Sequence, residues 1–140
     1  MYLIDTDVIS ETRKRSNANQ GVQTFFRQVI HEDTPVFISV VTFGELRRGV
    51  ELLRYRGDHQ QADRLEQWLD MLLRDYWNSI LDMDRDIAQL WGRLRVPHPE
   101  NALDKQIVAT ALIYNLTVVT RNQAHFRQTG VRLFNPFTES

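Results

Sequence analysis

Short apolar segments alternate with longer segments of helical periodicity in this chain, and this alternation constrains the fold more than any other feature. The segments predicted to be strands are Tyr2–Ile4, Val36–Ile38, Ser79–Leu81, Thr117–Val119 and Val131–Phe134. Between them, apolar residues recur every three to four positions, as Leu46, Val50 and Leu53 do, which is typical of amphipathic helices. Strands that are joined by helices form a parallel sheet covered on both faces. We therefore predict an α/β fold with a central, mostly parallel sheet.

The composition fits one globular domain. The chain has 140 residues, of which 42% are hydrophobic, so we predict a single domain over residues 1–140. It contains no cysteine, which excludes disulfides and thiolate zinc sites. The apolar start is broken by Asp5, and no stretch approaches the roughly 18 apolar residues of a membrane span. We expect a soluble, cytoplasmic protein with no membrane partner.

The charge of the chain is nearly balanced. A net charge of −1 provides no overall positive field that would attract nucleic acid. All 17 basic residues except Lys14 and Lys105 are arginine, and guanidinium groups bind phosphates and carboxylates through paired hydrogen bonds. A general compositional preference for arginine explains this equally well, so the charge neither establishes nor excludes a nucleic-acid substrate.

Polar side chains follow the predicted strands at the points where a parallel sheet binds its ligands. Asp5 directly follows the first strand, and the helix after the second strand carries Glu45. Asp104 stands near the start of the apolar helix that precedes the fourth strand, and Asn122 lies just beyond that strand. Because ligands bind beyond the carboxyl ends of parallel strands, we expect three carboxylates and one amide to converge there.

A hard divalent cation would explain such a cluster. Carboxylates that share one pocket cannot all be ionised at neutral pH without a compensating charge. Magnesium binds oxygen ligands and is usually shared with a phosphate, and it can activate water for phosphodiester cleavage. The histidines show no zinc-ligand spacing; they are His31, His59, His98 and His125.

Each of these polar residues also has a simpler interpretation. We expect Asp7 to cap a helix that begins near Val8. Asp104 could stabilise a helix dipole from the first turn, Asn122 could cap the next short helix, and Glu45 could be a solvated helix position. The prediction of a metal site therefore depends on the set and not on any single member.

Several longer motifs extend over almost the whole chain. In order they are YLIDTDVISE, SVVTFGELRRGVELL, LWGRLR, DKQIVATALIYNLTVVTRNQAHF and TGVRLFNPF. By these motifs, their order and their spacing, the chain resembles the PIN-domain nucleases. Within them it is similar to the VapC/FitB-type toxins of type II toxin–antitoxin pairs.

The resemblance implies a three-layer α/β/α fold and an endoribonuclease that hydrolyses RNA phosphodiester bonds with Mg²⁺, or with Mn²⁺ in its place. It assigns Asp5, Glu45 and Asp104 as metal ligands and Asn122 as the fourth member of the catalytic set. The same resemblance places Thr6 and Thr120 at the rim of the site. The arginines expected to hold the RNA backbone, because they lie near these positions in sequence, are Arg47, Arg48 and Arg121.

The resemblance also implies partners. Toxins of this kind are neutralised by a small VapB-like antitoxin, whose tail passes over the active site and whose other end binds operator DNA. The toxin would contact operator DNA only through the antitoxin, and it would form a homodimer. The apolar residues that could contribute to these surfaces, or else simply to the core, are Trp68, Leu72, Trp91 and Phe137.

The chain departs from the family pattern at three places. The family usually has Asn where this chain has Asp7. It often has Asp where this chain has Asn122, although the members most similar to this chain commonly have Asn there. A neutral amide is a weaker ligand, which puts a fully occupied second metal in doubt. The segment RVPHPENALD before the apolar helix is also short compared with longer relatives, so substrate access or specificity could differ.

Two rival classes remain open. An aspartyl phosphatase of the haloacid-dehalogenase type also begins with a strand and Asp-x-Asp, with Asp5 as nucleophile and Asp7 as general acid. That class needs an acidic pair after a late strand, where this chain reads TVVTRN. The other rival is a catalytically inactive PIN fold that only binds a partner or RNA, although retention of Asp5, Glu45 and Asp104 favours an enzyme.

Overall fold

The computed structural model describes residues 1–139 and is built around a five-stranded sheet with the strand order β3-β2-β1-β4-β5. All four strand pairings are parallel, for example with Leu3 beside Phe37 and beside Val118. The predicted α/β fold with a central parallel sheet is therefore confirmed. The strands are β1 (Tyr2–Ile4), β2 (Val36–Ser39), β3 (Ile80–Leu81), β4 (Thr117–Val119) and β5 (Leu133–Phe134).

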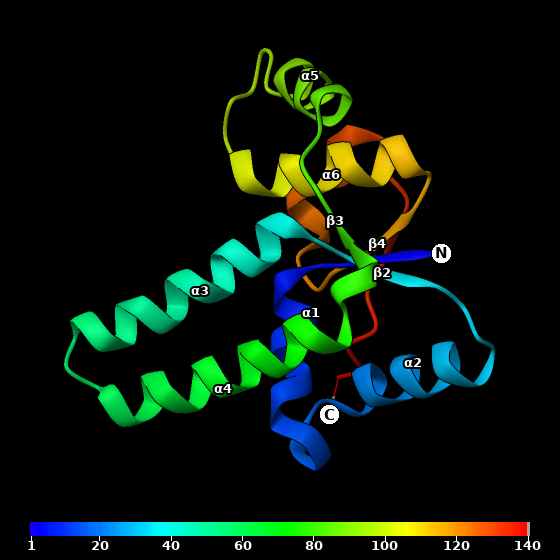
Figure 1. Cartoon of the computed structure of the whole chain (residues 1–140). Coiled ribbons are helices and arrows are strands. Elements are labelled where there is room, and N and C mark those ends of the chain that lie inside the picture. The colour runs from blue at the N-terminus through cyan, green and yellow to red at the C-terminus, as the bar shows by residue number, and fades with distance from the viewer. Residues whose placement is uncertain (140) are drawn as a thin grey trace.

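Helices cover both faces of this sheet (Figure 1). The α-helices are α1 (Thr6–Glu11), α2 (Gln20–His31), α3 (Val40–Tyr55), α4 (His59–Asp75), α5 (Arg85–Leu94) and α6 (Ala102–Tyr114). Short 3₁₀ turns connect some of them: η1 (Thr12–Asn17), η2 (Trp77–Ser79), η3 (Gln123–His125) and η4 (Arg127–Thr129). The short helix predicted after the fourth strand is thus two 3₁₀ turns, η3 and η4. No helix within residues 1–139 is both long and apolar enough to cross a bilayer.

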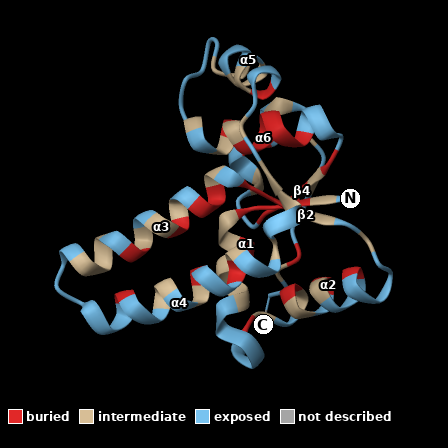
Figure 2. Cartoon of the chain, in the orientation of Figure 1, coloured by how far each residue is buried: buried red, intermediate tan, exposed pale blue. Residues whose placement is uncertain are grey.

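Two hydrophobic cores form because successive side chains of a strand point to opposite faces of the sheet. Ile4 and Val119 pack into the larger core with helices α1 to α4. Leu3 and Val118, one residue earlier in each strand, pack into the second core with α6. Figure 2 shows the buried residues gathered where the helices face the sheet. This two-sided burial explains why the central strands are continuous apolar runs.

Helices α3 and α4 lie side by side as an arm that projects from the sheet (Figure 1). Ser39 caps the start of α3, because its side-chain hydroxyl accepts a hydrogen bond from the Val41 backbone N–H at 3.1 Å. The connection between the two helices is short, because α3 continues to Tyr55 and the Asp58 side chain caps α4 by accepting a hydrogen bond from the Gln61 N–H. An ion pair between Arg54 and Glu66 ties the two helices together.

The start of α1 also differs from the prediction. Asp5, and not Asp7, is the N-cap, since the Asp5 Oδ1 atom accepts a hydrogen bond from the Thr6 N–H at 2.8 Å. The backbone N–H of Asp5 still pairs with the Val119 carbonyl of β4. Strand and helix therefore meet without a linker, and Asp7 falls inside the first turn with its side chain available for other contacts.

Candidate functional site

A pocket of about 530 Å³ opens at the carboxyl edge of the central strands. Its walls come from the start of α1, the first turns of α3 and α6, and the residues after β4. The side chains predicted to form the catalytic set all line this one pocket: Asp5, Glu45, Asp104 and Asn122. Thr6 and Asp7 line it as well. The structure therefore brings together residues that lie up to 117 positions apart in the sequence.

Asp5 is the most deeply buried acid of the pocket. Its Oδ2 atom accepts a hydrogen bond from the Thr120 hydroxyl at 2.8 Å, while its Oδ1 atom accepts from the Thr6 N–H. Burial, and then the negative charge of Asp7, raise the pKa of Asp5 to about 6, against the lowering effect of these two hydrogen bonds. The carboxylate is thus held in a fixed orientation at a place that disfavours its charge.

Asp7 contributes a second destabilised carboxyl group. Its Oδ2 atom accepts a hydrogen bond from the Arg121 N–H at 3.1 Å. Its Oδ1 atom is buried and has no hydrogen-bond partner among residues 1–139. Burial raises the pKa of Asp7, and the nearby charge of Asp104 acts in the same direction. The charge of Arg121 lowers the pKa of Asp7 only in part, so this half of the pocket holds two carboxyl groups, Asp5 and Asp7, whose ionised forms are disfavoured.

Glu45 reaches the same pocket from α3. It lies one helical turn after Val41, which also lines the pocket, and its side chain is partly exposed. The Thr6 hydroxyl donates a hydrogen bond to the Thr42 hydroxyl at 3.1 Å, which joins the start of α1 to the start of α3. Glu45 is therefore held at a fixed place relative to Asp5.

Asp104 is in the first turn of α6, and its carboxylate contacts His125, which the sequence does not predict as a site residue. His125 Nδ1 lies 2.9 Å from Asp104 Oδ2. The available signal was its position three residues after Asn122, which places both residues in one tight turn beside the predicted site.

Thr120 and Asn122 form the wall that follows β4. Thr120 is fully buried and lies behind Asp5, so it orients that carboxylate and does not face the open pocket. The Asn122 N–H donates a hydrogen bond to the Thr120 hydroxyl at 3.1 Å. Asn122 makes no side-chain capping hydrogen bond to η3, so its amide group remains available at the pocket.

The three predicted arginines lie in different places. The Arg47 guanidinium pairs with Glu66 of α4 and lies on the arm, so the structure does not bring it to the pocket. Arg48 is exposed and lies on α3 one turn beyond Glu45. Arg121 adjoins the pocket through its backbone, and its guanidinium lies over the ring of Phe137 at 4.6 Å.

The donor set suits a hard divalent cation. Within residues 1–139, no three His, Asp, Glu or Cys side chains are already arranged as a metal cage. The pocket nevertheless offers carboxylate and amide oxygens. The raised pKa values of Asp5 and Asp7 show that the charge of these carboxyl groups is not fully compensated. Within the described residues, the buried Oδ1 atom of Asp7 also has no hydrogen-bond partner. Magnesium and manganese prefer such oxygen ligands, and magnesium keeps several waters that can bridge the remaining distances. The residues present therefore fit such an ion.

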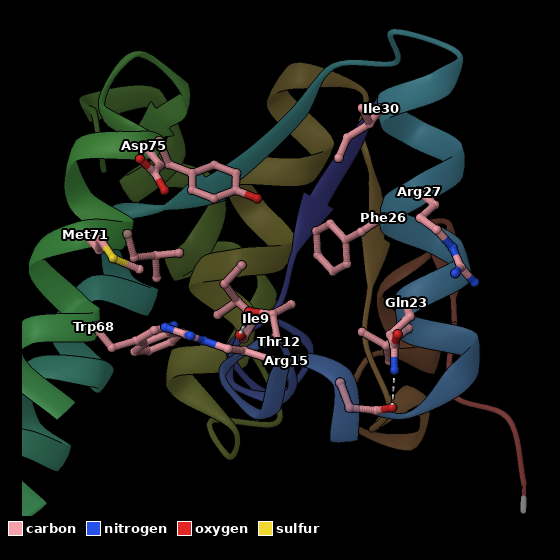
Figure 3. Close-up of a pocket in the computed structure, with 14 residues that line it drawn as sticks. Ile9, Thr12, Arg15, Gln23, Phe26, Arg27, Ile30, Trp68, Met71 and Asp75 are labelled. Carbon is pink, nitrogen blue, oxygen red and sulfur yellow. Dashed lines mark hydrogen bonds between the residues drawn. The ribbon is translucent and has the colours of Figure 1, made fainter. Parts of the chain in front are cut away.

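A second, apolar groove lies between α2 and α4 and has a volume of about 410 Å³. Figure 3 shows side chains of the two helices facing one another across it, with Phe26 and Ile30 on one side and Trp68 and Met71 on the other. None of the four side chains predicted to form the catalytic set lines this groove. We call it the α2–α4 groove.

Comparison with known proteins gives a consistent result. A family model described as PIN domain matches residues 2–131. The chain is 36% identical over 144 aligned positions to Toxin FitB from Neisseria gonorrhoeae, with 98% of this chain and 99% of that protein covered.

Solved structures agree with this sequence similarity. The crystal structure of FitAcB from Neisseria gonorrhoeae superposes with a TM-score of 0.81 at 34% identity, covering 97% of this chain and 98% of that one. The structure of FitAB bound to an IR36 DNA fragment superposes with a TM-score of 0.82 at 32% identity, covering 100% and 98%. By its family match and its full-length similarity to FitB, this chain belongs to the PIN-domain family.

Proposed function

We propose that this protein is the toxin of a type II toxin–antitoxin pair and acts as a divalent-metal-dependent endoribonuclease. The observation that carries this proposal is the convergence of Asp5, Glu45, Asp104 and Asn122 in one pocket at the carboxyl edge of the sheet. The raised pKa of Asp5 supports a role for a cation, because a buried carboxylate beside other acids needs compensating charge. The full-length similarity to FitB supports the assignment as a toxin.

Asp5, Glu45 and Asp104 would hold Mg²⁺ or Mn²⁺, either directly or through water. When bound, such an ion supplies an activated water and stabilises the charge that develops as a phosphodiester bond is hydrolysed. Asp5 enters this arrangement already oriented by Thr120 and the Thr6 N–H. Asn122 adds a neutral oxygen ligand or a hydrogen-bond donor to the substrate phosphate.

RNA would cross the mouth of this pocket. Arg48 of α3 and Arg121 of the segment after β4 lie close in sequence to the pocket residues Glu45 and Asn122, and their guanidinium groups would bind phosphates of the RNA backbone. Thr6 lines the pocket, and its hydroxyl oxygen, whose proton is donated to Thr42, can accept a hydrogen bond from a ribose 2′-hydroxyl of the substrate. Contacts of this kind position the chain and carry no sequence information.

The α2–α4 groove is the proposed docking site of a VapB-like antitoxin. The related FitB structures are complexes with FitA, and one of them includes DNA. Most of the side chains that line the groove are apolar, and its charged lining residues are two arginines, Arg15 and Arg27, and one acid, Asp75. An amphipathic segment with acidic flanks would match this lining. Contact with operator DNA would then be made by the antitoxin, and homodimer formation stays a prediction.

Cleavage by purified protein tests the proposal. The wild type should cut a mixed RNA substrate in Mg²⁺ or Mn²⁺, leaving 5′-phosphate and 3′-hydroxyl ends, and should stop in excess chelator. Asp5→Asn, at equal concentration and with a native circular dichroism spectrum, should lose at least 100-fold in rate, since it removes a charged ligand.

Asp86→Asn is the matched control, because Asp86 is an exposed acid in the first turn of α5, away from the pocket. It should cut at the wild-type rate. Metal-independent cleavage, or an Asp5→Asn protein as fast as wild type, would overturn the proposal. Binding of RNA without any cleavage would instead favour an inactive binding module.

A further inference from the structure

His125 connects two segments of the proposed site. It is the last residue of η3 and follows Asn122 by three positions, whereas its contact Asp104 belongs to α6. The distance from His125 Nδ1 to Asp104 Oδ2 is 2.9 Å. The side chains are 45% and 28% exposed, respectively, so the contact lies at the surface and not in the core, and Asp104 is the member of the pair that lines the pocket.

This contact is the one side-chain hydrogen bond that Asp104 makes within the described residues 1–139. Asp5, by comparison, has a separate donor for each of its oxygens. Loss of His125 would therefore leave the Asp104 side chain without a group that fixes its rotamer. Asp5 would keep one donor if the other were lost. With Oδ2 occupied by the imidazole, Oδ1 is the Asp104 oxygen left for another ligand.

The backbone that carries His125 is fixed relative to α6. The next residue, Phe126, is fully buried and packs in the second core with Ile107 and Val108, which belong to the same helix as Asp104. The backbone at His125 is thereby fixed by the core contacts of its neighbour Phe126. A hydrogen bond between such fixed elements orients a side chain with little loss of conformational freedom.

We propose that His125 is a positioning residue, which donates its Nδ1–H to Asp104 Oδ2 and so orients Oδ1 toward the divalent cation. This inference rests on the proposed function. The neutral Nδ1–H tautomer and the imidazolium ion both supply this donor, so the role does not depend on the charge of the histidine. Partners that hydrogen-bond to ligating groups typically change metal affinity by about 10- to 100-fold when they are removed.

The test measures Mn²⁺ affinity of the full chain by electron paramagnetic resonance, without RNA. His125→Ala removes the donor and should weaken Mn²⁺ binding by about 10- to 100-fold. His125→Asn places an amide N–H close to the position of Nδ1 and should stay within about threefold of wild type. His125→Gln extends its amide toward the position of Nε2 and should resemble His125→Ala.

His98→Ala is the matched control, because His98 Nδ1 also contacts a carboxylate, Glu100 at 3.5 Å, and neither residue lines the pocket. It should leave Mn²⁺ affinity unchanged. Melting temperatures of all variants in chelator identify any that have lost their fold. If His125→Ala is unfolded, the difference in Mn²⁺ affinity between His125→Asn and His125→Gln tests the inference instead.

Two results would overturn the inference alone. The first is wild-type affinity in His125→Ala or His125→Gln, and the second is an equal loss in His125→Asn and His125→Gln. If the wild type binds no Mn²⁺ and Asp5→Asn behaves identically, the proposed function fails, and the role of His125 fails with it.

Discussion

Neutralising Asp5 should stabilise the metal-free protein at neutral pH while it removes the proposed activity. The carboxyl group is buried, and burial together with Asp7 raises its pKa from 3.8 to about 6. The Asp5 carboxyl group therefore binds its proton more tightly in the folded state than in the unfolded chain. The contribution of Asp5 to stability is greatest below about pH 4 and is lost as the pH rises through about 6, because the unfolded state ionises this group more readily.

The size of the effect follows from this difference. A pKa of about 6 in place of 3.8 corresponds to about 3 kcal/mol of unfavourable free energy for the ionised form. Asn is neutral and nearly isosteric. Asp5→Asn should therefore raise the free energy of unfolding by up to about 3 kcal/mol at pH 7.5 in chelator, and by less than about 1 kcal/mol at pH 4.

Urea unfolding at pH 4, 5, 6, 7 and 8 in chelator measures this difference, with Asp86→Asn as the exposed control. Saturating Mg²⁺ should then stabilise the wild type, by about 2.7 kcal/mol at 100 times the dissociation constant, and should leave Asp5→Asn unchanged. The reasoning is refuted if the two proteins have the same stability at pH 7.5, or if their difference does not vary with pH.

Two further predictions concern the pocket charge and the α2–α4 groove. Asp7→Asn should raise the free energy of unfolding in chelator at pH 7.5, because burial raises the pKa of Asp7. Asn122→Asp adds a carboxylate to the pocket, so it should lower the free energy of unfolding in chelator and tighten Mn²⁺ binding. Equilibrium unfolding and Mn²⁺ titration check both, and the opposite order of stabilities would contradict the charge argument. Met71→Glu places a charge in the groove at a side chain that is 41% exposed, so it should abolish copurification of a FitA-like antitoxin without slowing RNA cleavage. A complex that survives this change would place the antitoxin elsewhere.

The strands and the convergence of the site were predictable from local pattern and topology. Tyr2–Ile4 and Thr117–Val119 are short apolar runs buried on both faces, and their predicted bounds match the structure. Because parallel strands align their carboxyl ends, the order of elements alone placed Asp5 and Asn122 at one edge.

Other features depend on tertiary contacts that no local pattern encodes. Asp5 and Asp7 are equally good helix caps, and the choice between them follows from the pairing of the Asp5 N–H with β4. The position of Arg47 depends on Glu66, which lies in a different helix. The contact between His125 and Asp104 likewise requires that η3 be packed against α6.

The central claim is that Asp5, Glu45 and Asp104 together hold a divalent cation at the edge of the sheet. Anomalous diffraction from crystals of the full chain grown with Mn²⁺ tests this claim most directly. The account predicts a strong peak within the pocket, with at least one of these carboxylates at about 2.0–2.2 Å and the others bound directly or through ordered water. Crystals that hold Mn²⁺ at other sites while the pocket stays empty at saturating concentration would contradict it.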